Sequence, residues 1–230
     1  MLPSSTVENY LKAIHHGQST LPRGQRLLPM GHVASALSVT PGTATTMVKA
    51  LAESGLVEYE PYTGVRLTKA GDKLAALVLR RHRLVELFLV QVMGMSWDEV
   101  HDEAEQLEHV VSDRLIERID AMLGRPTHDP HGDPIPDPHG AIAQRHLDSL
   151  LTCPMDTLLR VIRIADQDPA FLRFIEHNNL KPGQSIAVAA RDAAADSVVL
   201  RAKDGTLTID TRAASKLLVD VASSESKRHS

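Results

Sequence analysis

In the first ninety residues, apolar side chains recur every three or four positions in four separate stretches. This spacing is typical of helices that bury one face. The predicted helices cover residues 5–16, 30–38, 41–53 and 68–92. The first is expected to begin with a capping box formed by Ser5 and Glu8, because these residue types stand three positions apart.

The segment between the third and fourth helices has a different pattern. Residues 56–60 and 65–67 contain β-forming side chains, and Pro61–Gly64 separates them with turn residues. This predicts a β-hairpin. The order of helix, helix, helix, hairpin and helix is typical of a winged helix-turn-helix. Its recognition helix would start with Thr40 as N-cap and Pro41 at the first helical position.

The next apolar pattern predicts one long helix over residues 97–123. At about 100° of rotation per residue, four of its polar side chains fall within about 100° of arc, beside an apolar stripe. These side chains are His101, Glu105, Glu108 and His109. On the preceding helix, His82 and Glu86 stand four residues apart and share a face. The six groups indicate a metal site, and the alternative is a solvated acidic helix that happens to carry two histidines.

Proline, glycine, aspartate and histidine dominate residues 124–140, so we expect an irregular loop there. Its histidines, His128, His131 and His139, could bind metal, but a loop histidine is more often polar filler. Residues 141–154 are expected to form a linker with a short helix at its start.

The last part of the chain combines short alternating segments with turn residues, which predicts a small β-barrel. Strands are expected over residues 157–164, 185–190, 197–202 and 207–210, a helix over 169–177, and a last helix or closing strand over 213–219. The polar residues 223–230 are expected to be a disordered tail.

Charge is distributed unevenly along the chain, although the net charge is only −4. Residues 1–83 hold ten Lys and Arg against five Asp and Glu, whereas residues 84–140 hold three against thirteen. A basic segment followed by an acidic one suggests an anionic partner for the first and cations for the second.

Composition narrows the setting. The single cysteine, Cys153, excludes an internal disulfide and fits a reducing compartment. No apolar run reaches membrane-spanning length, and no secretory signal pattern is visible at the start. These observations predict a cytoplasmic protein without a membrane partner.

The exposed face of the predicted recognition helix suits contacts to phosphates and base edges in double-stranded DNA. The alternative is that its threonines only cap and fill exposed helix positions. The candidate DNA-binding residues are Thr40, Pro41, Thr43, Thr45, Thr46 and Lys49, with Arg66 on the hairpin.

The order of these elements resembles the diphtheria-toxin-repressor family of metal-dependent transcriptional regulators, in its manganese-sensing branch. Residues 80–86, 100–109 and 130–136 carry the resemblance. It implies an α+β fold that is mostly α. The implied domains are a winged helix-turn-helix at 1–75, a helical metal-binding and dimerisation domain at 76–140, the linker 141–154, an SH3-like, FeoA-like β-barrel at 155–222 and the tail 223–230.

The resemblance also implies two metal positions in each chain. The primary position would use Glu105, Glu108 and His109, with Asn9 from the first helix, and the ancillary one would use His82, Glu86 and His101, with Asp168 from the barrel. Glutamate stands at position 105, where iron sensors carry a cysteine, and this implies Mn²⁺, with Fe²⁺ as the alternative. Lys12 stands where the manganese branch has a second acidic residue.

The resulting hypothesis is a homodimeric repressor of metal-uptake genes that is not an enzyme. Bound metal would fix the separation of the two recognition helices so that they match a palindromic operator. Two rivals remain at this point. One is a winged-helix regulator that senses a small organic ligand, and the other is a dinuclear metal hydrolase.

Overall fold

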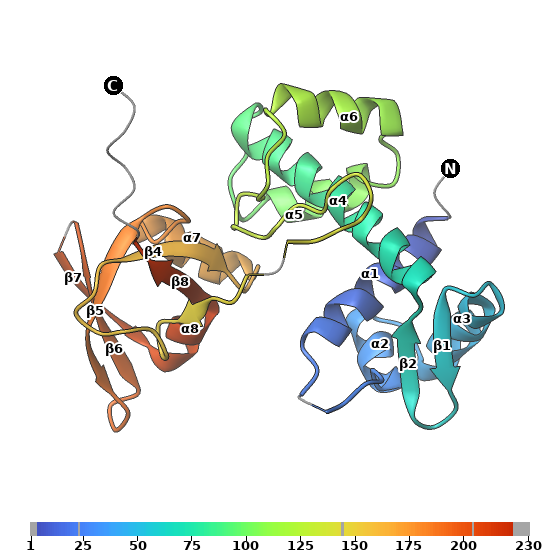
Figure 1. Ribbon diagram of the computed structural model, residues 1–230, viewed down its shortest axis with the longest axis horizontal. Coiled ribbons are helices and arrows are strands. Elements are labelled where there is room, and N and C mark those ends of the chain that lie inside the picture. Colours follow the sequence, from blue (N-terminus) through green and yellow to red (C-terminus); the bar gives the residue numbers. More distant parts are fainter. Residues whose placement is uncertain (1–3, 23, 144, 204, 223–230) are drawn as a thin grey trace. The chain divides into compact units, whose positions relative to one another are not determined.

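The computed structural model describes residues 4–22, 24–143, 145–203 and 205–222 (Figure 1). The chain divides into two compact units, each made of several segments. Unit 1 comprises Met1–Leu84, Gln106–Arg118 and Ile135–Ala143, and unit 2 comprises Val85–Glu105, Ile119–Pro134 and Gln144–Ser230. The division passes through one continuous helix, α4 (Lys69–Gln91).

Unit 1 begins with the predicted winged helix-turn-helix (Figure 1, blue to cyan). Its elements are α1 (Ser5–Ser19), α2 (Met30–Ala36), α3 (Pro41–Glu53), β1 (Val57–Glu60) and β2 (Gly64–Leu67). The two strands pair antiparallel, with Val57 opposite Leu67. The apolar positions that predicted the helices form one core, in which Leu11, Ile14 and Val48 are fully buried.

The predicted single helix over residues 97–123 is wrong. The chain forms α5 (Val100–Leu107) and α6 (Asp113–Met122), with turns between them. The guanidinium of Arg81 on α4 donates hydrogen bonds to the main-chain oxygens of Glu108, at 3.1 Å, and Val111, at 2.8 Å. It also pairs with the Asp113 carboxylate at the start of α6. This partner satisfies carbonyl groups that a continuous helix would have used internally, so the helix is interrupted here.

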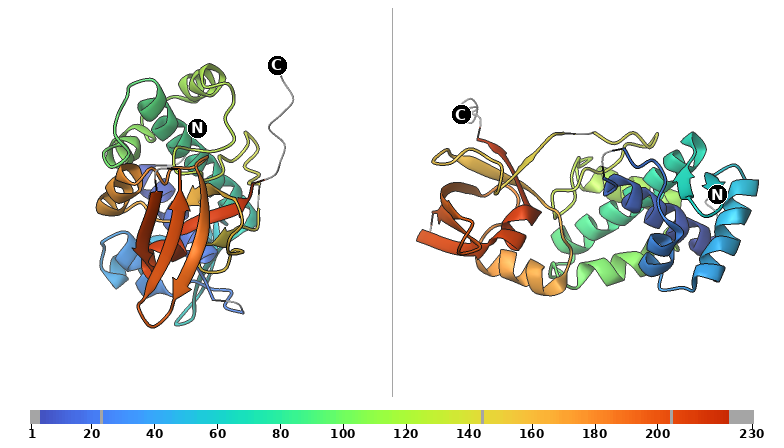
Figure 2. Two further views of the ribbon diagram at one scale, coloured as in Figure 1. Left: turned by 90° about the vertical axis from the view of Figure 1, so that its left-hand side faces the viewer. Right: turned by 90° about the horizontal axis from the view of Figure 1, so that it is seen from below.

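Unit 2 contains a six-stranded antiparallel sheet of strand order β3-β8-β4-β5-β6-β7, with its strands side by side in Figure 2. The elements are β3 (Asp148–Ser149), β4 (Leu159–Ile164), α7 (Pro169–His177), β5 (Ser185–Asp192), β6 (Ser197–Ala202), β7 (Gly205–Asp210), α8 (Thr211–Lys216) and β8 (Leu217–Val221). Register shifts between Val161 and Arg163 and between Val188 and Ala190 bend the sheet. Helix α7 packs its buried Leu172 and Ile175 into the same core.

Two details of this unit differ from the sequence predictions. The segment 213–219 is both a helix end and the start of a strand, because α8 passes directly into β8. The expected short helix at the start of the linker is absent from the described part of residues 141–154, where β3 forms instead. The tail predicted for residues 223–230 lies outside the described residues. Within the described ranges, no helix is long and apolar enough to cross a membrane.

Gly71 in α4 should be the least replaceable helical glycine of unit 1. A Cβ atom there would lie 1.9 Å from the main-chain oxygen of Leu56, which cannot move aside cheaply. We expect Gly71→Ala to lower the free energy of unfolding by about 1–3 kcal/mol, as overpacking does. Urea denaturation of the purified protein measures this change.

Gly31 in α2 is the matched control, since a Cβ atom there meets nothing within 4 Å. Gly31→Ala should leave stability unchanged or raise it by about 0.5–1 kcal/mol through helix propensity. Equal urea midpoints for the two variants would contradict the packing of α4 described above.

Candidate metal centres and nucleic-acid interface

The first turns of α3 show how its threonines are used. The Thr40 hydroxyl accepts the main-chain N–H of Thr43 at 3.2 Å and caps the helix. The hydroxyls of Thr45 and Thr46 donate to the carbonyls of Pro41 and Gly42 one turn earlier. The hydroxyls of Thr45 and Thr46 therefore have their protons committed to the helix and keep lone pairs that can accept a further hydrogen bond.

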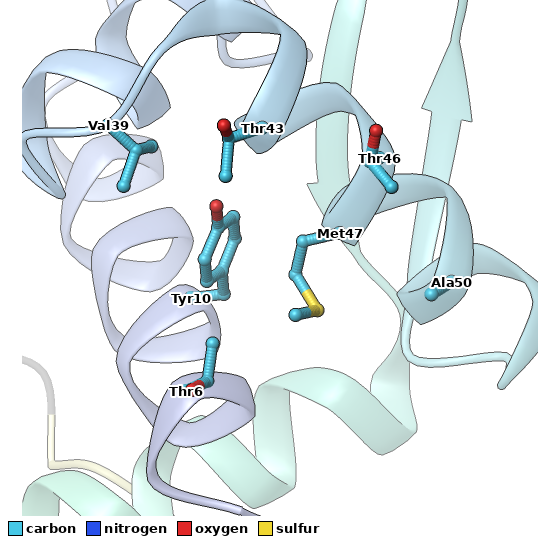
Figure 3. Close-up of a pocket in the computed structure, with 7 residues that line it drawn as sticks. All are labelled: Thr6, Tyr10, Val39, Thr43, Thr46, Met47 and Ala50. Carbon is cyan, nitrogen blue, oxygen red and sulfur yellow. The ribbon is translucent and has the colours of Figure 1, made fainter.

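Other candidate DNA contacts are placed as follows. Lys49 is exposed on α3, and the Arg66 Nε atom donates to the Glu58 carboxylate at 2.6 Å across the hairpin. Thr43 and Thr46 also border an apolar hollow between α1 and α3, in which the Tyr10 ring lies (Figure 3). The role of these residues in DNA binding stays a prediction.

A cluster of charged side chains lies inside unit 1, and we call it the first cluster. It consists of Glu8 and Lys12 from α1, His82 from α4, and Glu108 and His109, which follow the end of α5. The closest contacts are three. His109 Nδ1 lies 2.6 Å from Glu8 Oε2, His82 Nδ1 lies 2.5 Å from Glu108 Oε2, and Lys12 Nζ lies 2.8 Å from Glu108 Oε1.

Glu108 is the centre of the first cluster, and its side chain has no exposed surface. Burial raises the pKa of this carboxyl. The hydrogen bond and charge of His82 and the ammonium of Lys12 lower it by more, so the net shift of the pKa is downward. The group is therefore a carboxylate at neutral pH. A buried carboxylate of this kind is a strong ligand for a divalent cation.

Among the described residues of unit 1, two buried atoms that could bind a metal ion have no hydrogen-bond partner. They are Oδ1 of Asn9 and Nε2 of His109. The His109 nitrogen lies 3.5 Å from Oε1 of Glu108. Since a buried polar atom without a partner is costly, these atoms fit a site that a metal ion completes. The donors are oxygen and imidazole nitrogen, which suits hard or borderline cations.

A second cluster lies inside unit 2 and consists of Glu86, His101, Asp129 and His131. The Glu86 side chain is fully buried. Its Oε1 lies 3.2 Å from Nδ1 of His101 and its Oε2 lies 3.9 Å from Nδ1 of His131. Potential ligand atoms of Glu86, Asp129 and His131 all lie within 4.8 Å of one another. These three side chains come from a helix and a loop that the sequence places more than forty residues apart.

Sequence reasoning named Glu86 and His101 but missed Asp129 and treated His131 as polar filler. That treatment was wrong, because His131 has no exposed surface. Its main-chain oxygen accepts the N–H of Ile164 on β4, and its ring meets Trp97 edge-on at 5.2 Å. The loop sequence Asp-Pro-His-Gly-Asp-Pro was the available signal, but its burial depends on partners distant in the sequence.

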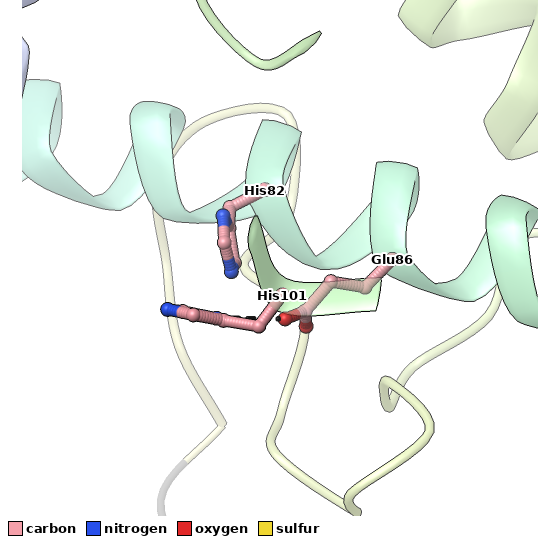
Figure 4. Close-up of side chains that lie close together, drawn as sticks. All are labelled: His82, Glu86 and His101. Atoms are coloured by element: carbon pink, nitrogen blue, oxygen red, sulfur yellow. Dashed lines mark hydrogen bonds and ion pairs between the residues drawn. The ribbon is translucent and has the colours of Figure 1, made fainter. Parts of the chain in front are cut away.

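Of the predicted ancillary trio, Glu86 and His101 belong to the second cluster, and His82 belongs to the first. Figure 4 draws His82 and Glu86 on α4 and His101 on α5. Glu105 itself lies 3.8 Å from His101, one turn away on α5.

Glu8, Glu108, His109 and Asp168 are placed differently from what the sequence predicted. Glu8 is not part of a capping box, since α1 has Ser4 as N-cap without a side-chain cap and the Glu8 side chain is buried against His109. Glu108 and His109 do not share a helix face with His101, because α5 ends at Leu107. Asp168 caps α7 by accepting the N–H of Phe171 at 3.0 Å, and it belongs to none of the metal-compatible groups found among the described residues.

Asp168 can be tested as cap and as ligand separately. We expect Asp168→Ala to lower the free energy of unfolding by about 1 kcal/mol through loss of the N-cap. Asp168→Asn keeps a capping oxygen and should restore most of that stability while removing the charge. Calorimetric metal titration of both variants completes the test. If Asp168→Asn keeps the stability of the wild type but binds metal more weakly, Asp168 is a metal ligand.

Three family models match successive parts of the chain. The N-terminal DNA-binding domain of iron-dependent repressors matches residues 3–65, and their metal-binding and dimerisation domain matches residues 68–137. The FeoA domain matches residues 149–221. The three matches follow the order of the winged helix, the ligand-bearing helices and the sheet.

Related sequences agree with these models. An uncharacterised HTH-type transcriptional regulator of Methanocaldococcus jannaschii is 34% identical over 120 residues, which are 52% of this chain and 94% of the relative. The iron-dependent repressor IdeR of Mycobacterium tuberculosis is 35% identical over 132 residues, which are 57% of this chain. That match spans only about half of the mycobacterial repressor, 55% of its length.

Similar solved structures extend the likeness over nearly the whole chain. A manganese-dependent transcriptional repressor in complex with manganese has a TM-score of 0.83 and 39% identity, covering 94% of this chain and 99% of its own. The manganese regulator SloR has a TM-score of 0.73 and 30% identity, covering 96% and 100%.

Proposed function

Because this chain belongs to the diphtheria-toxin-repressor family of metal-dependent, DNA-binding transcriptional regulators, we propose that Mn²⁺ activates it as a dimeric repressor at a palindromic operator. The observation that carries the proposal is the first cluster, which joins α1 to the residues after α5. Glu8 on α1 meets His109, and Lys12 on α1 meets Glu108. A cation bound there would act directly on a helix of the DNA-binding domain.

The family decides between the rival functions. Its members are DNA-binding repressors and not enzymes, so the metal hydrolase is set aside. The relatives include a repressor described as iron-dependent and others described as manganese-dependent. Those descriptions support a divalent metal, and not an organic molecule, as the effector of this chain.

The donor set supports Mn²⁺ over Fe²⁺ within that range. Both clusters offer carboxylate oxygens and imidazole nitrogens. Cys153, the single thiol, lies in the core of the sheet, where its sulfur contacts the Arg191 guanidinium. Without a thiolate ligand, hard oxygen-rich coordination of Mn²⁺ is favoured over that of softer, later metals.

We assign one ion to each cluster. The first would take Glu108 and His109, with Asn9 Oδ1 or Glu8 from α1. The second would take ligands from the set Glu86, His101, Asp129 and His131. Bound cations would add positive charge beside these buried carboxylates, which is the chemistry the metal contributes.

The coupling to DNA is a matter of linkage. Metal shifts the protein only if it binds the DNA-competent arrangement more tightly than the other one. Ligands on α1 and after α5 meet the ion together only when α1 is held in one position, and the proposal is that this position is the DNA-competent one. In a dimer the two copies of α3 would then match half-sites separated by about one turn of DNA.

Mn²⁺ should strengthen binding to a palindromic promoter fragment by at least about tenfold, which is within the usual range of allosteric coupling. Fluorescence anisotropy with labelled DNA, in excess Mn²⁺ and in chelator, measures the change. Lys49→Ala should weaken DNA binding in both conditions and reduce the salt dependence by about one counterion. Equal DNA affinity of the wild type with and without Mn²⁺ would end the metal-switch proposal.

Ion counting distinguishes the two clusters. The wild type should bind two Mn²⁺ per chain at saturation, as measured by elemental analysis after desalting. His131→Ala and His109→Ala should each leave one ion, because the two imidazoles serve different clusters. Of the two variants, only His131→Ala should retain part of the metal response of DNA binding. A wild-type count of one, or loss of both ions from either variant, would contradict the two-centre assignment.

A further inference from the structure

Among the described residues, Lys12 is the one lysine in the first cluster, and it lies on α1. Its ammonium lies 2.8 Å from Oε1 of Glu108, and its side chain keeps about a fifth of its surface exposed, 19%. The other Glu108 oxygen, Oε2, is held by His82 at 2.5 Å. The buried carboxylate thus has both oxygens engaged before any metal arrives.

The oxygen that Lys12 holds is also the one nearest to the imidazole ligand. Nε2 of His109 is buried without a hydrogen-bond partner and lies 3.5 Å from the same Oε1. A cation that used His109 Nε2 and Glu108 together would bind through Oε1. The ammonium and the cation therefore need the same atom.

We propose that Lys12 is a resident counter-cation that competes with the metal ion for Oε1 of Glu108 and so sets the metal concentration at which the first cluster fills. The inference rests on the proposed function. It adds a determinant of metal affinity that is not itself a ligand, since a protonated amine has no lone pair to offer.

The sign of the effect follows from the charges. In the metal-free protein Lys12 neutralises a carboxylate that has no exposed surface, and this stabilises the metal-free state. With a divalent ion on Oε1, the ammonium faces a like charge a few ångströms away in a region of low dielectric. It must withdraw toward solvent along its four-carbon stem or repel the ion. An interaction that favours the metal-free state weakens metal binding by the same free energy.

A purely structural ion pair would have the opposite consequence. If Lys12 only held Glu108 in the orientation that the metal needs, its removal would let the carboxylate turn and would weaken metal binding. Removing the Lys12 charge lowers metal-free stability in both cases. It raises metal affinity only if Lys12 competes with the ion, so measuring both quantities on the same variants separates the two roles.

Lys12→Met is the decisive variant, because methionine keeps much of the side-chain length and removes the charge. We expect it to bind Mn²⁺ about tenfold more tightly than the wild type, or more. We also expect a lower melting temperature in chelator and half-maximal DNA binding at a correspondingly lower Mn²⁺ concentration. Free Mn²⁺ measured by electron paramagnetic resonance gives the affinity of the full-length protein directly.

Two further variants act as controls. Lys12→Arg keeps the charge and should stay near the wild type in Mn²⁺ affinity. Lys69→Met removes an exposed lysine from the start of α4 and should change neither affinity nor metal-free stability. If Lys12→Met fails to fold in chelator, Lys12→Gln, which retains hydrogen bonding, gives the same comparison.

The outcomes separate this inference from the function on which it rests. Wild-type protein that binds no Mn²⁺ would remove both. Wild-type binding with an unchanged or weaker Lys12→Met affinity would overturn the competition and leave the metal-dependent function standing. Tighter binding by Lys69→Met as well would reduce the effect to overall charge and would also overturn it.

Discussion

The first cluster is organised by the free-energy cost of burying the Glu108 carboxylate away from water. A buried carboxylate needs opposite charge and hydrogen bonds, and those come from His82 on α4 and Lys12 on α1. Each of these partners lies on a different helix of unit 1. Satisfying one buried charge therefore draws α1, α4 and the segment after α5 to a common point, where the proposed metal ligands Asn9, Glu108 and His109 lie.

The interruption between α5 and α6 puts Glu108 and His109 at that point. A continuous helix would have kept their main-chain groups bonded within the helix and their side chains at fixed angles to His101. Arg81 instead takes the carbonyls of Glu108 and Val111 as hydrogen-bond acceptors. The guanidinium suits this task because its several donors are fixed in one plane and it is always charged. The turn thus frees the side chains of Glu108 and His109, two proposed ligands, from the helical repeat.

In unit 2 the loop that supplies His131 is held by main-chain contacts to β4. The Ile164 N–H donates to the His131 oxygen at 2.8 Å, and Arg163 pairs with Asp133 at 2.5 Å. Gly132 has φ +86°, and a Cβ atom there would lie 1.9 Å from the Ile162 oxygen. Only glycine allows the loop to approach the strand so closely. The sheet thereby contributes to the second cluster by placing the His131 side chain.

The sequence by itself determined the elements whose signals are local. Thr40 and Pro41 start α3, Pro169–His177 forms α7 and Ser197–Ala202 forms β6, as capping and periodicity predicted. Tertiary structure decided the rest. The end of α5 depends on Arg81, the role of Glu8 depends on a histidine 101 positions away, and the burial of His131 depends on β4. Periodicity reports only on neighbours within a few residues, whereas these outcomes are set by charges and hydrogen-bonding groups that become neighbours only in the folded chain.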